Sequence, residues 1–292
     1  MGSVNYTGYY LNLDRDVDRR RTVENQLAAY NLQAVYQRYP AALGNALNLN
    51  APKLSPGAVG CFTSHYLLLK SLVDSPVHVH VVEDDAVFAS CTGAVIDAFL
   101  KNGGIDNWDL LYTDIWIPVN LDLIRELSTL FSRCATIDPK SGALSVNQFT
   151  LIDLKGRIFA STVSYIVNRR SVRKITELLA GAVAGGLSQS IDLFYRQQIH
   201  QGQLKAACLF PFVTSVNVRQ NLLTNISDRN DADLLRSILT STVLRNLFFV
   251  QCNPSRLREI TEEHLIFPEL DDRAKVLAAV SRFAGSPSFK PY

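Results

Sequence analysis

Three consecutive carboxylates, Glu83, Asp84 and Asp85, follow directly on the apolar segment 77–82. Adjacent negative charges repel each other, so burying them is costly without a compensating cation. Carboxylate oxygens are the ligands that Mg²⁺ and Mn²⁺ prefer, and these ions bind diphosphates in turn. The acidic triplet therefore predicts a divalent-metal site that holds a diphosphate, and a solvated acidic turn is the less favoured alternative.

The valine-rich segment 77–82 is expected to position this triplet. Valine is β-branched and suits a buried strand, and a short apolar run of this kind is typical of a parallel sheet covered on both faces. Ligands of open α/β sheets bind at the carboxyl ends of the strands, where the triplet would lie. His78 and His80 share one face in mid-strand, so we favour core histidines over metal ligands for both.

Basic residues follow the first predicted strand, which spans 9–13. Arg15, Arg19 and Arg20 lie near the point where this strand gives way to a helix. A guanidinium group in that position binds a phosphate or the edge of a nucleotide. For each arginine taken singly, a solvated helix face is an equally good interpretation.

A buried helix is predicted from Ser55 to about Val73, with Pro56 at its first position. Its apolar residues cover much of its circumference, which is typical of a helix enclosed on most sides. Ser64 and His65 are then polar groups carried into an interior or a cleft, and Gly60 permits close backbone approach. Function and a hydrogen-bonded core role are evenly matched for this group.

Two further carboxylates stand where elements begin or end. Asp114 closes a predicted strand, 108–114, at the same sheet edge as the acidic triplet. Asp192 lies in the first turn of a helix that begins near Ser188 or Ser190, where the helix macrodipole stabilises its ionised form. A purely structural alternative for Asp192 is therefore that its negative charge only complements the positive end of the helix dipole.

Strands alternate with helices through the first half of the chain, which predicts an open α/β fold with a mainly parallel sheet. Residues 146–152 and 157–167 are expected to pair as a hairpin through Lys155-Gly156, and a helix from Ser171 is expected to stop at Gly181. We expect one domain over 1–226 and a helical C-terminal extension over 227–292 that packs on it.

The composition of the 292-residue chain limits the classes of partner that it is expected to bind. A net charge of +2 offers no electrostatic basis for binding nucleic acid. Five scattered cysteines without a CxxC pair indicate free thiols, and with no signal peptide or membrane-spanning run we expect a cytoplasmic protein. Arginines in the C-terminal helices suggest peripheral contact with the inner face of a membrane, although interleaved acidic residues favour ordinary core packing. These arginines are Arg236, Arg245, Arg256 and Arg258.

Four sequence blocks together resemble glycosyltransferase family 25, the lipopolysaccharide-type galactosyltransferases and their collagen-modifying relatives. The second and third blocks, in this order and spacing, carry most of the specificity. The blocks are 10–15 with Arg19 and Arg20, then 55–65, then 82–86, and finally 162–167 followed by Ile191-Asp192.

This resemblance implies a GT-A-type fold and an inverting, metal-dependent transfer of a hexose such as galactose from a UDP-sugar to a glycan such as lipopolysaccharide. It implies that Asp85 and Asp84 hold Mn²⁺ or Mg²⁺, and that Glu83 or Asp84 faces the nucleotide. Asp192 ranks first and Asp114 second as the base that removes the proton from the acceptor hydroxyl. The other donor-site candidates that the blocks contain are Asn12, Arg15, Arg19, Arg20, Gly60, Ser64, His65, Thr162 and Tyr165.

Two alternatives use the same residues differently. The first is a degenerate transferase that binds a nucleotide sugar or a glycan without catalysis. The second is a metal-dependent hydrolase, which is weakened because no second cluster of metal ligands is evident in the sequence.

Overall fold

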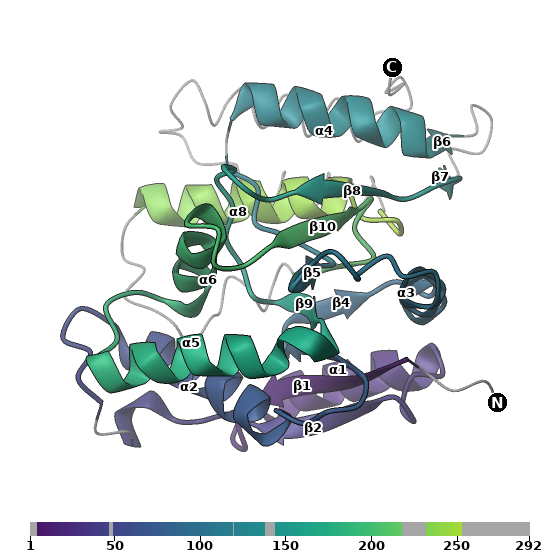
Figure 1. Ribbon diagram of the computed structural model, residues 1–292. Coiled ribbons are helices and arrows are strands. Elements are labelled where there is room, and N and C mark those ends of the chain that lie inside the picture. Colours follow the sequence, from purple (N-terminus) through teal and green to yellow (C-terminus); the bar gives the residue numbers. More distant parts are fainter. Residues whose placement is uncertain (1–4, 47–48, 119, 138–143, 218–231, 253–292) are drawn as a thin grey trace.

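The computed structural model describes residues 5–46, 49–118, 120–137, 144–217 and 232–252, without the side chains of 121 and 232–239. A central sheet lies between two layers of helices (Figure 1). This arrangement confirms the α/β class with a large, mostly parallel sheet.

The central sheet has seven strands in the order β2-β1-β3-β9-β5-β10-β8. β2, β1, β3, β5 and β10 run in one direction, whereas β9 and β8 run in the opposite direction. The strand bounds are β1 (Tyr6–Asn12), β2 (Tyr36–Pro40), β3 (His78–Glu83), β5 (Leu110–Tyr112), β8 (Thr150–Asp153), β9 (Ser164–Val167) and β10 (Ala206–Phe210). Two small antiparallel pairs flank the sheet: β4 (Ala86–Phe88) with β11 (Thr214–Val216), and β6 (Ala135–Ile137) with β7 (Leu144–Val146).

Helices cover both faces of the sheet because both faces of its strands are apolar. One core packs strand residues against α2 (Pro56–Ser71), α5 (Val172–Gly185) and α6 (Ile191–His200). The same core continues beneath α4 (Leu121–Cys134) and α8 (Ala232–Leu247) at the β8 end of the sheet (Figure 1). The second core packs the opposite face against α1 (Val17–Ala29) and α3 (Thr92–Lys101). Two short 3₁₀ helices, η1 (Gly44–Ala46) and η2 (Arg169–Ser171), complete the described elements.

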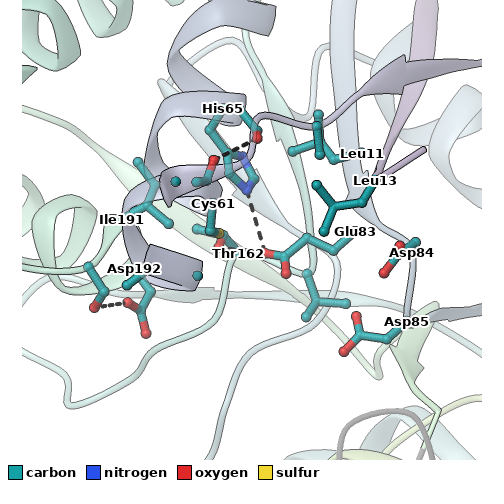
Figure 2. A pocket seen from close by; sticks show the side chains of 18 of the residues that line it. Leu11, Leu13, Cys61, His65, Glu83, Asp84, Asp85, Thr162, Ile191 and Asp192 are labelled. Carbon is teal, nitrogen blue, oxygen red and sulfur yellow. Dashed lines mark hydrogen bonds and ion pairs between the residues drawn. The ribbon is translucent and has the colours of Figure 1, made fainter. Parts of the chain in front are cut away.

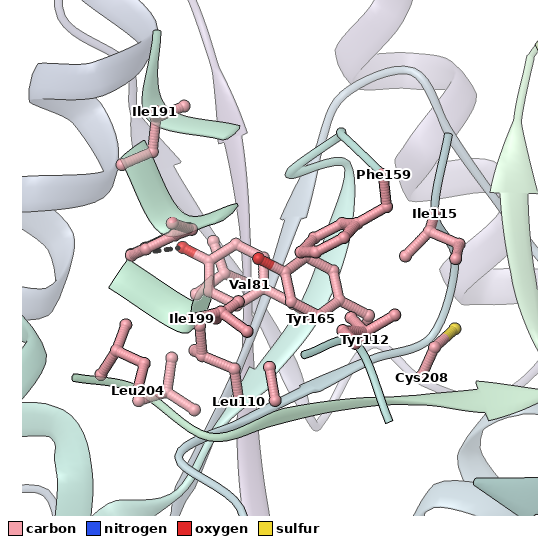
Figure 3. Close-up of a cluster of buried hydrophobic side chains, with 14 of the residues drawn as sticks. Val81, Leu110, Tyr112, Ile115, Phe159, Tyr165, Ile191, Ile199, Leu204 and Cys208 are labelled. Atoms are coloured by element: carbon pink, nitrogen blue, oxygen red, sulfur yellow. Dashed lines mark hydrogen bonds between the residues drawn. The ribbon is translucent and has the colours of Figure 1, made fainter. Parts of the chain in front are cut away.

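Side chains of β3 point alternately to the two faces of the sheet, so this one strand contributes residues to both cores. Val79 and Val81 point into the first core, where Val81 lies close to the buried ring of Tyr165 (Figure 3). Val82 points into the second core. Successive strand residues face opposite sides, so a strand covered on both faces must be apolar at nearly every position. The buried strand predicted for 77–82 is confirmed.

His80 is the polar residue among the fully buried positions of β3, and both of its ring nitrogens have hydrogen-bond partners. Its Nδ1 lies 2.7 Å from the Tyr36 hydroxyl, and its Nε2 lies 2.9 Å from Oγ of Ser164. Burial lowers the pKa of His80 to about 3, so the ring is neutral in the folded protein. The predicted role as a core histidine is confirmed.

Two expectations for the middle of the chain are wrong. The expected hairpin does not form, because β5 and β10 lie between β8 and β9 in the sheet. The helix α5 runs past Gly181 and ends at Gly185, where Gly186 adopts a φ of +91°. Burial of Ile175 and Leu179 against the core outweighs the small helical penalty of one glycine, about 1 kcal/mol.

The start of α2 and the cysteines behave as predicted. Ser55 caps α2, and its Oγ accepts a hydrogen bond from the Ala58 backbone N–H at 3.3 Å. All five cysteines are free thiols. None of the helices within the described ranges has the length and apolar character needed to cross a bilayer.

The helix α8 is part of the core rather than a loose appendage. Val243, Leu244 and Phe248 are buried, and the backbone N–H of Phe212 donates to the Phe248 carbonyl at 3.0 Å. Arg245 is also buried, so it does not face lipid as the membrane-contact expectation required. Arg256, Arg258 and the rest of 253–292 lie outside the described residues, as does the expected boundary at 226.

Candidate active site

A cleft of about 750 Å³ opens where β1 and β3 end and α2 and α6 begin (Figure 2). The carboxyl ends of parallel strands and the amino ends of helices meet here, as is usual for ligand sites in α/β sheets. Most predicted site residues line the cleft: Asn12, Arg15, Arg19, Gly60, Ser64, His65, Glu83, Asp84, Asp85, Thr162 and Asp192. Arg20, Asp114 and Tyr165 do not line it.

Asp84 is held by two partners from the start of the chain. The Asn12 side-chain amide donates to Oδ2 at 2.7 Å, and Arg19 donates from Nη1 to Oδ1 at 2.7 Å. Burial raises the pKa of Asp84, and Arg19 and Asn12 act against that rise. Since each carboxylate oxygen already accepts a hydrogen bond, this arrangement fixes Asp84 in place between β1, α1 and β3.

Asp85 is buried without such partners. Its Oδ1 has no hydrogen-bond partner among the described residues, although the residue is only 7% exposed. Burial first, and then the neighbouring charges of Glu83 and Asp84, raise the pKa of Asp85 to about 7. An unpaired buried carboxyl oxygen is costly, so this oxygen at the cleft wall makes Asp85 a candidate ligand-binding residue.

Glu83 is the last residue of β3, and its side chain lies next to His65 of α2. Thr162 donates its hydroxyl to Oε1 of Glu83 at 2.7 Å, and His65 Nε2 lies 3.5 Å from the same oxygen. Burial raises the pKa of Glu83, but the contributions of His65, Thr162 and Arg245 outweigh it, so the pKa lies below its usual value. Glu83 is therefore an ionised carboxylate at the cleft wall.

His65 connects the cleft to the interior. Its Nδ1 lies 2.8 Å from the Tyr165 hydroxyl, which in turn lies 3.4 Å from the hydroxyl of Tyr195. Tyr165 is completely buried, so the expectation that it lines the cleft is wrong. Its ring belongs to the first core (Figure 3), and its hydroxyl contacts His65 from the interior.

Gly60 and Ser64 of α2 contact the loop that contains Ala42 and Gly44, which also lines the cleft. Ser64 accepts a hydrogen bond on Oγ from the Ala42 backbone N–H at 2.8 Å. A Cβ atom at Gly60 would lie 2.5 Å from the Ala42 carbonyl oxygen and 2.9 Å from the Gly44 nitrogen. The close backbone approach predicted for Gly60 is therefore confirmed, because no side chain fits between α2 and this loop.

Asp192 faces the acidic triplet from the far wall, in the first turn of α6 (Figure 2). The Ser190 hydroxyl donates to Oδ1, and the Ser161 backbone N–H donates to Oδ2 at 3.5 Å. The carboxylate lines the cleft and is half-buried.

Asp114 is placed differently. It is completely buried and receives hydrogen bonds on both oxygens from Arg245 of α8, with Nε 2.7 Å from Oδ1 and 3.0 Å from Oδ2. Burial raises the pKa of Asp114, and Arg245 partly offsets the rise. Asp114 therefore anchors Arg245, and neither its position nor its partners suit a base that meets an acceptor.

The sequence profile of glycosyltransferase family 25, described as an LPS biosynthesis protein family, matches residues 6–185. The chain belongs to glycosyltransferase family 25. The resemblance inferred from the four blocks is thus confirmed, and the family assigns to the chain a glycosyltransferase activity in lipopolysaccharide biosynthesis, with a nucleotide-sugar donor and a glycan acceptor. No curated protein sequence matches the chain.

Part of the family 25 cleft comes from beyond the matched residues. Asp192 and Arg245 both line the cleft, yet both follow residue 185. Arg245 also donates from Nη2 to the Ser161 hydroxyl at 3.0 Å, which ties α8 to the wall that carries Asp192. Nothing in the sequence around Arg245 distinguishes it from a surface arginine, so its role was not predicted.

Cys61 also lines the cleft, although it was not among the predicted site residues. It lies one helical turn before His65 on α2, and burial raises the pKa of its thiol, with smaller contributions from Glu83, Asp192 and Asp85. The spacing Cys61-x-x-x-His65 was the available signal, because residues four apart lie on one helix face.

Proposed function

We propose that this family 25 protein transfers a hexose, with galactose as the leading example, from a UDP-sugar to a lipopolysaccharide acceptor with inversion. The observation that carries the proposal is the buried Oδ1 of Asp85, which no described residue engages, in a cleft large enough for a nucleotide sugar. A sheet that delivers an acidic group to its carboxyl edge also supports a GT-A-type fold.

The residues at this edge fit a divalent cation. Asp85 supplies a hard oxygen without a hydrogen-bond partner in the part of the chain that the structure describes, and Glu83 supplies a second carboxylate from the same strand end. Both are suited to Mn²⁺ or Mg²⁺, and Asp84 contributes negative charge while it holds Arg19. When bound, the cation would neutralise the charge that develops on the departing nucleoside diphosphate.

The wall formed by β1 and α1 suits the nucleotide. Arg19 is fixed by Asp84, and Arg15 is largely exposed at the mouth of the cleft. Arginine forms bidentate hydrogen bonds with phosphate, so these two side chains are the proposed contacts to the diphosphate. Asn12 holds Asp84 in position for this arrangement.

Asp192 is the proposed base on the opposite wall. Its carboxylate would accept the proton of the acceptor hydroxyl while that oxygen bonds to the anomeric carbon. The bond from the anomeric carbon to the diphosphate breaks on the opposite side in the same displacement, which inverts the configuration. Ser190 and the Ser161 backbone orient the carboxylate for this step.

The five free thiols favour a reducing compartment, so we propose that the reaction takes place in the cytoplasm with the acceptor at the inner face of the membrane. Association of the protein itself with that membrane is a separate expectation. Co-sedimentation with anionic vesicles tests it, and the absence of binding would remove it.

A thermal-shift screen of nucleotide sugars with and without Mn²⁺ tests the proposal. A saturating UDP-sugar with Mn²⁺ is expected to stabilise the parent by about 2–3 kcal/mol, which the melting temperature reports. Asp85→Asn should lose this metal-dependent shift. Asp97→Asn is the matched control, because Asp97 also has a buried oxygen without a hydrogen-bond partner among the described residues but does not line the cleft.

Release of UDP from the same donor with lipopolysaccharide acceptor completes the test. Metal-dependent release by the parent supports a transferase. Donor binding without release would leave a degenerate binding protein, and an unchanged metal response in Asp85→Asn would overturn the assigned metal site.

A further inference from the structure

We propose that Cys61, His65 and Glu83 form a second cation site in the cleft, one that takes a borderline-soft divalent ion such as Zn²⁺. Each residue offers one ligand atom, and the three atoms lie within 4.8 Å of one another. Sulfur, nitrogen and oxygen converge here on one point of the cleft wall (Figure 2).

Two buried elements hold these ligands in place. Cys61 and His65 are four residues apart on α2, so they lie on one helix face. Glu83 ends β3 and is oriented by the hydroxyl of Thr162. Ligands carried by packed elements are more accurately positioned than ligands on loops.

The imidazole of His65 is the observation that points to a ligand. Its Nε2 is buried and has no hydrogen-bond partner among the described residues, while Nδ1 is engaged by the Tyr165 hydroxyl. A proton on Nδ1 can be donated to the Tyr165 oxygen, which leaves the Nε2 lone pair directed toward Glu83 and Cys61. Metal-binding histidines commonly use one ring nitrogen for the metal and the other for a hydrogen bond of this kind.

The distances suit a small tetrahedral ion after a modest adjustment. Two ligand atoms bound to one zinc ion are separated by roughly 3.6 Å. His65 Nε2 and Glu83 Oε1 are already 3.5 Å apart, and the Cys61 sulfur lies within 4.8 Å of the ligand atoms of both residues, so it needs to move closer by about 1 Å at most. A fourth position then faces the cleft, because all three residues line it.

The donor set distinguishes this site from the one at Asp85. Thiolate and imidazole ligands favour Zn²⁺ over Mn²⁺ and Mg²⁺, which prefer oxygen alone. One thiolate and one carboxylate balance the charge of a divalent ion, with the imidazole neutral. Binding breaks the S–H bond of Cys61, forms a sulfur–metal bond and releases the proton to solvent.

Glu83 would belong to both sites, which gives the second site a regulatory consequence. A zinc ion that holds Glu83 removes it from the donor side of the cleft, so Zn²⁺ and the UDP-sugar with Mn²⁺ are expected to compete. This consequence rests on the proposed function, whereas the binding of the cation does not.

Titration with Co²⁺, a spectroscopic substitute for Zn²⁺, tests the site without any substrate. The parent should show a thiolate-to-cobalt charge-transfer absorption at one equivalent, and Zn²⁺ should abolish it. Cys61→Ser, which is nearly isosteric, should remove the absorption, and Glu83→Gln should weaken cobalt binding at least tenfold. Cys91→Ser is the matched control, because Cys91 is a half-buried free thiol that does not line the cleft.

Absence of the absorption in the parent, or its persistence in Cys61→Ser, would overturn the proposal. Asp85→Asn separates the two sites, since it should keep the cobalt signal while losing the Mn²⁺-dependent donor response. A donor response without a cobalt signal would leave the transferase proposal standing and remove only the second site. A cobalt signal without a donor response would support the second site and remove the transferase proposal.

Discussion

Arg245 of α8 forms a buried ion pair with Asp114, a residue 131 positions earlier that lies two residues after β5 ends. The guanidinium engages both carboxylate oxygens and the hydroxyl of Ser161. This contact joins a helix beyond the family-matched residues to the centre of the sheet and to the wall of the cleft.

Arg245→Ala should destabilise the fold by about 3–5 kcal/mol, because it leaves the Asp114 carboxylate buried without a cation. Urea unfolding at neutral pH measures the loss. The double variant Asp114→Asn with Arg245→Gln should recover part of it, since neither remaining group is charged. A loss below about 1 kcal/mol in the single variant would show that the pair contributes little.

Gly60→Ala should lower stability by about 1–3 kcal/mol and weaken donor binding, because a Cβ atom there meets the backbone of Ala42 and Gly44. The loop that lines the cleft must move to accept it. Gly181→Ala is the matched control, since Gly181 lies inside α5 with no atom within 4 Å of an added Cβ. That control should be neutral or stabilising by up to about 1 kcal/mol, and equal losses in both variants would refute the packing argument.

The buried His80 should make the fold sensitive to mild acid. Its pKa is about 3 in the folded protein and near 6.5 in the unfolded chain, so the unfolded state binds the extra proton between these values. Stability attributable to neutral His80 is complete above pH 6.5 and is lost as the pH falls toward 3, at up to about 1.4 kcal/mol per pH unit.

Urea unfolding at pH 7.5 and pH 5 measures this dependence. His80→Gln should be less stable than the parent at pH 7.5 but should lose about 2 kcal/mol less on acidification to pH 5. His200→Gln removes an exposed histidine and should keep the pH dependence of the parent. Equal acid sensitivity in the parent and His80→Gln would contradict the assignment.

Asp192→Asn should lower kcat by about 10²–10⁴-fold, because the amide cannot accept the proton of the acceptor hydroxyl. The thermal shift produced by donor and Mn²⁺ should be unchanged, since Asp192 lies on the wall opposite the acidic triplet (Figure 2). Glu177→Gln, on the exposed face of α5, serves as the control. Turnover within threefold of the parent would exclude Asp192 as the base.

The features that could be predicted from the sequence are those determined by residue types within one short segment. The valine run of β3, the Ser55 cap of α2 and the closely packed Gly60 each follow from the residue types themselves. The position of the acidic triplet at the cleft followed from the rule that ligands bind at the carboxyl ends of parallel strands, whereas Asn12 and Asp192 were expected there only from the resemblance to family 25.

The failures concern relationships between distant segments. Residues 146–167 contain two strand-like stretches and a turn, but the insertion of β5 and β10 between β8 and β9 depends on long-range pairing. Asp114 was expected at the sheet edge and Arg245 in a C-terminal helix, but nothing in the sequence pairs them, and only tertiary packing brings them together as a buried ion pair. Tyr165 was assigned to the cleft because its block was recognised, although its side-chain direction places it in the core.

The strand β10 follows the matched residues 6–185, yet it occupies the interior of the sheet between β5 and β8. A shortened protein that stopped at residue 185 would leave the backbone edge of β5 open and the Asp114 carboxylate without its cation. Such a fragment is expected to aggregate through that edge rather than fold. We therefore expect the smallest unit that folds on its own to extend at least through α8, well past the segment by which the family is recognised.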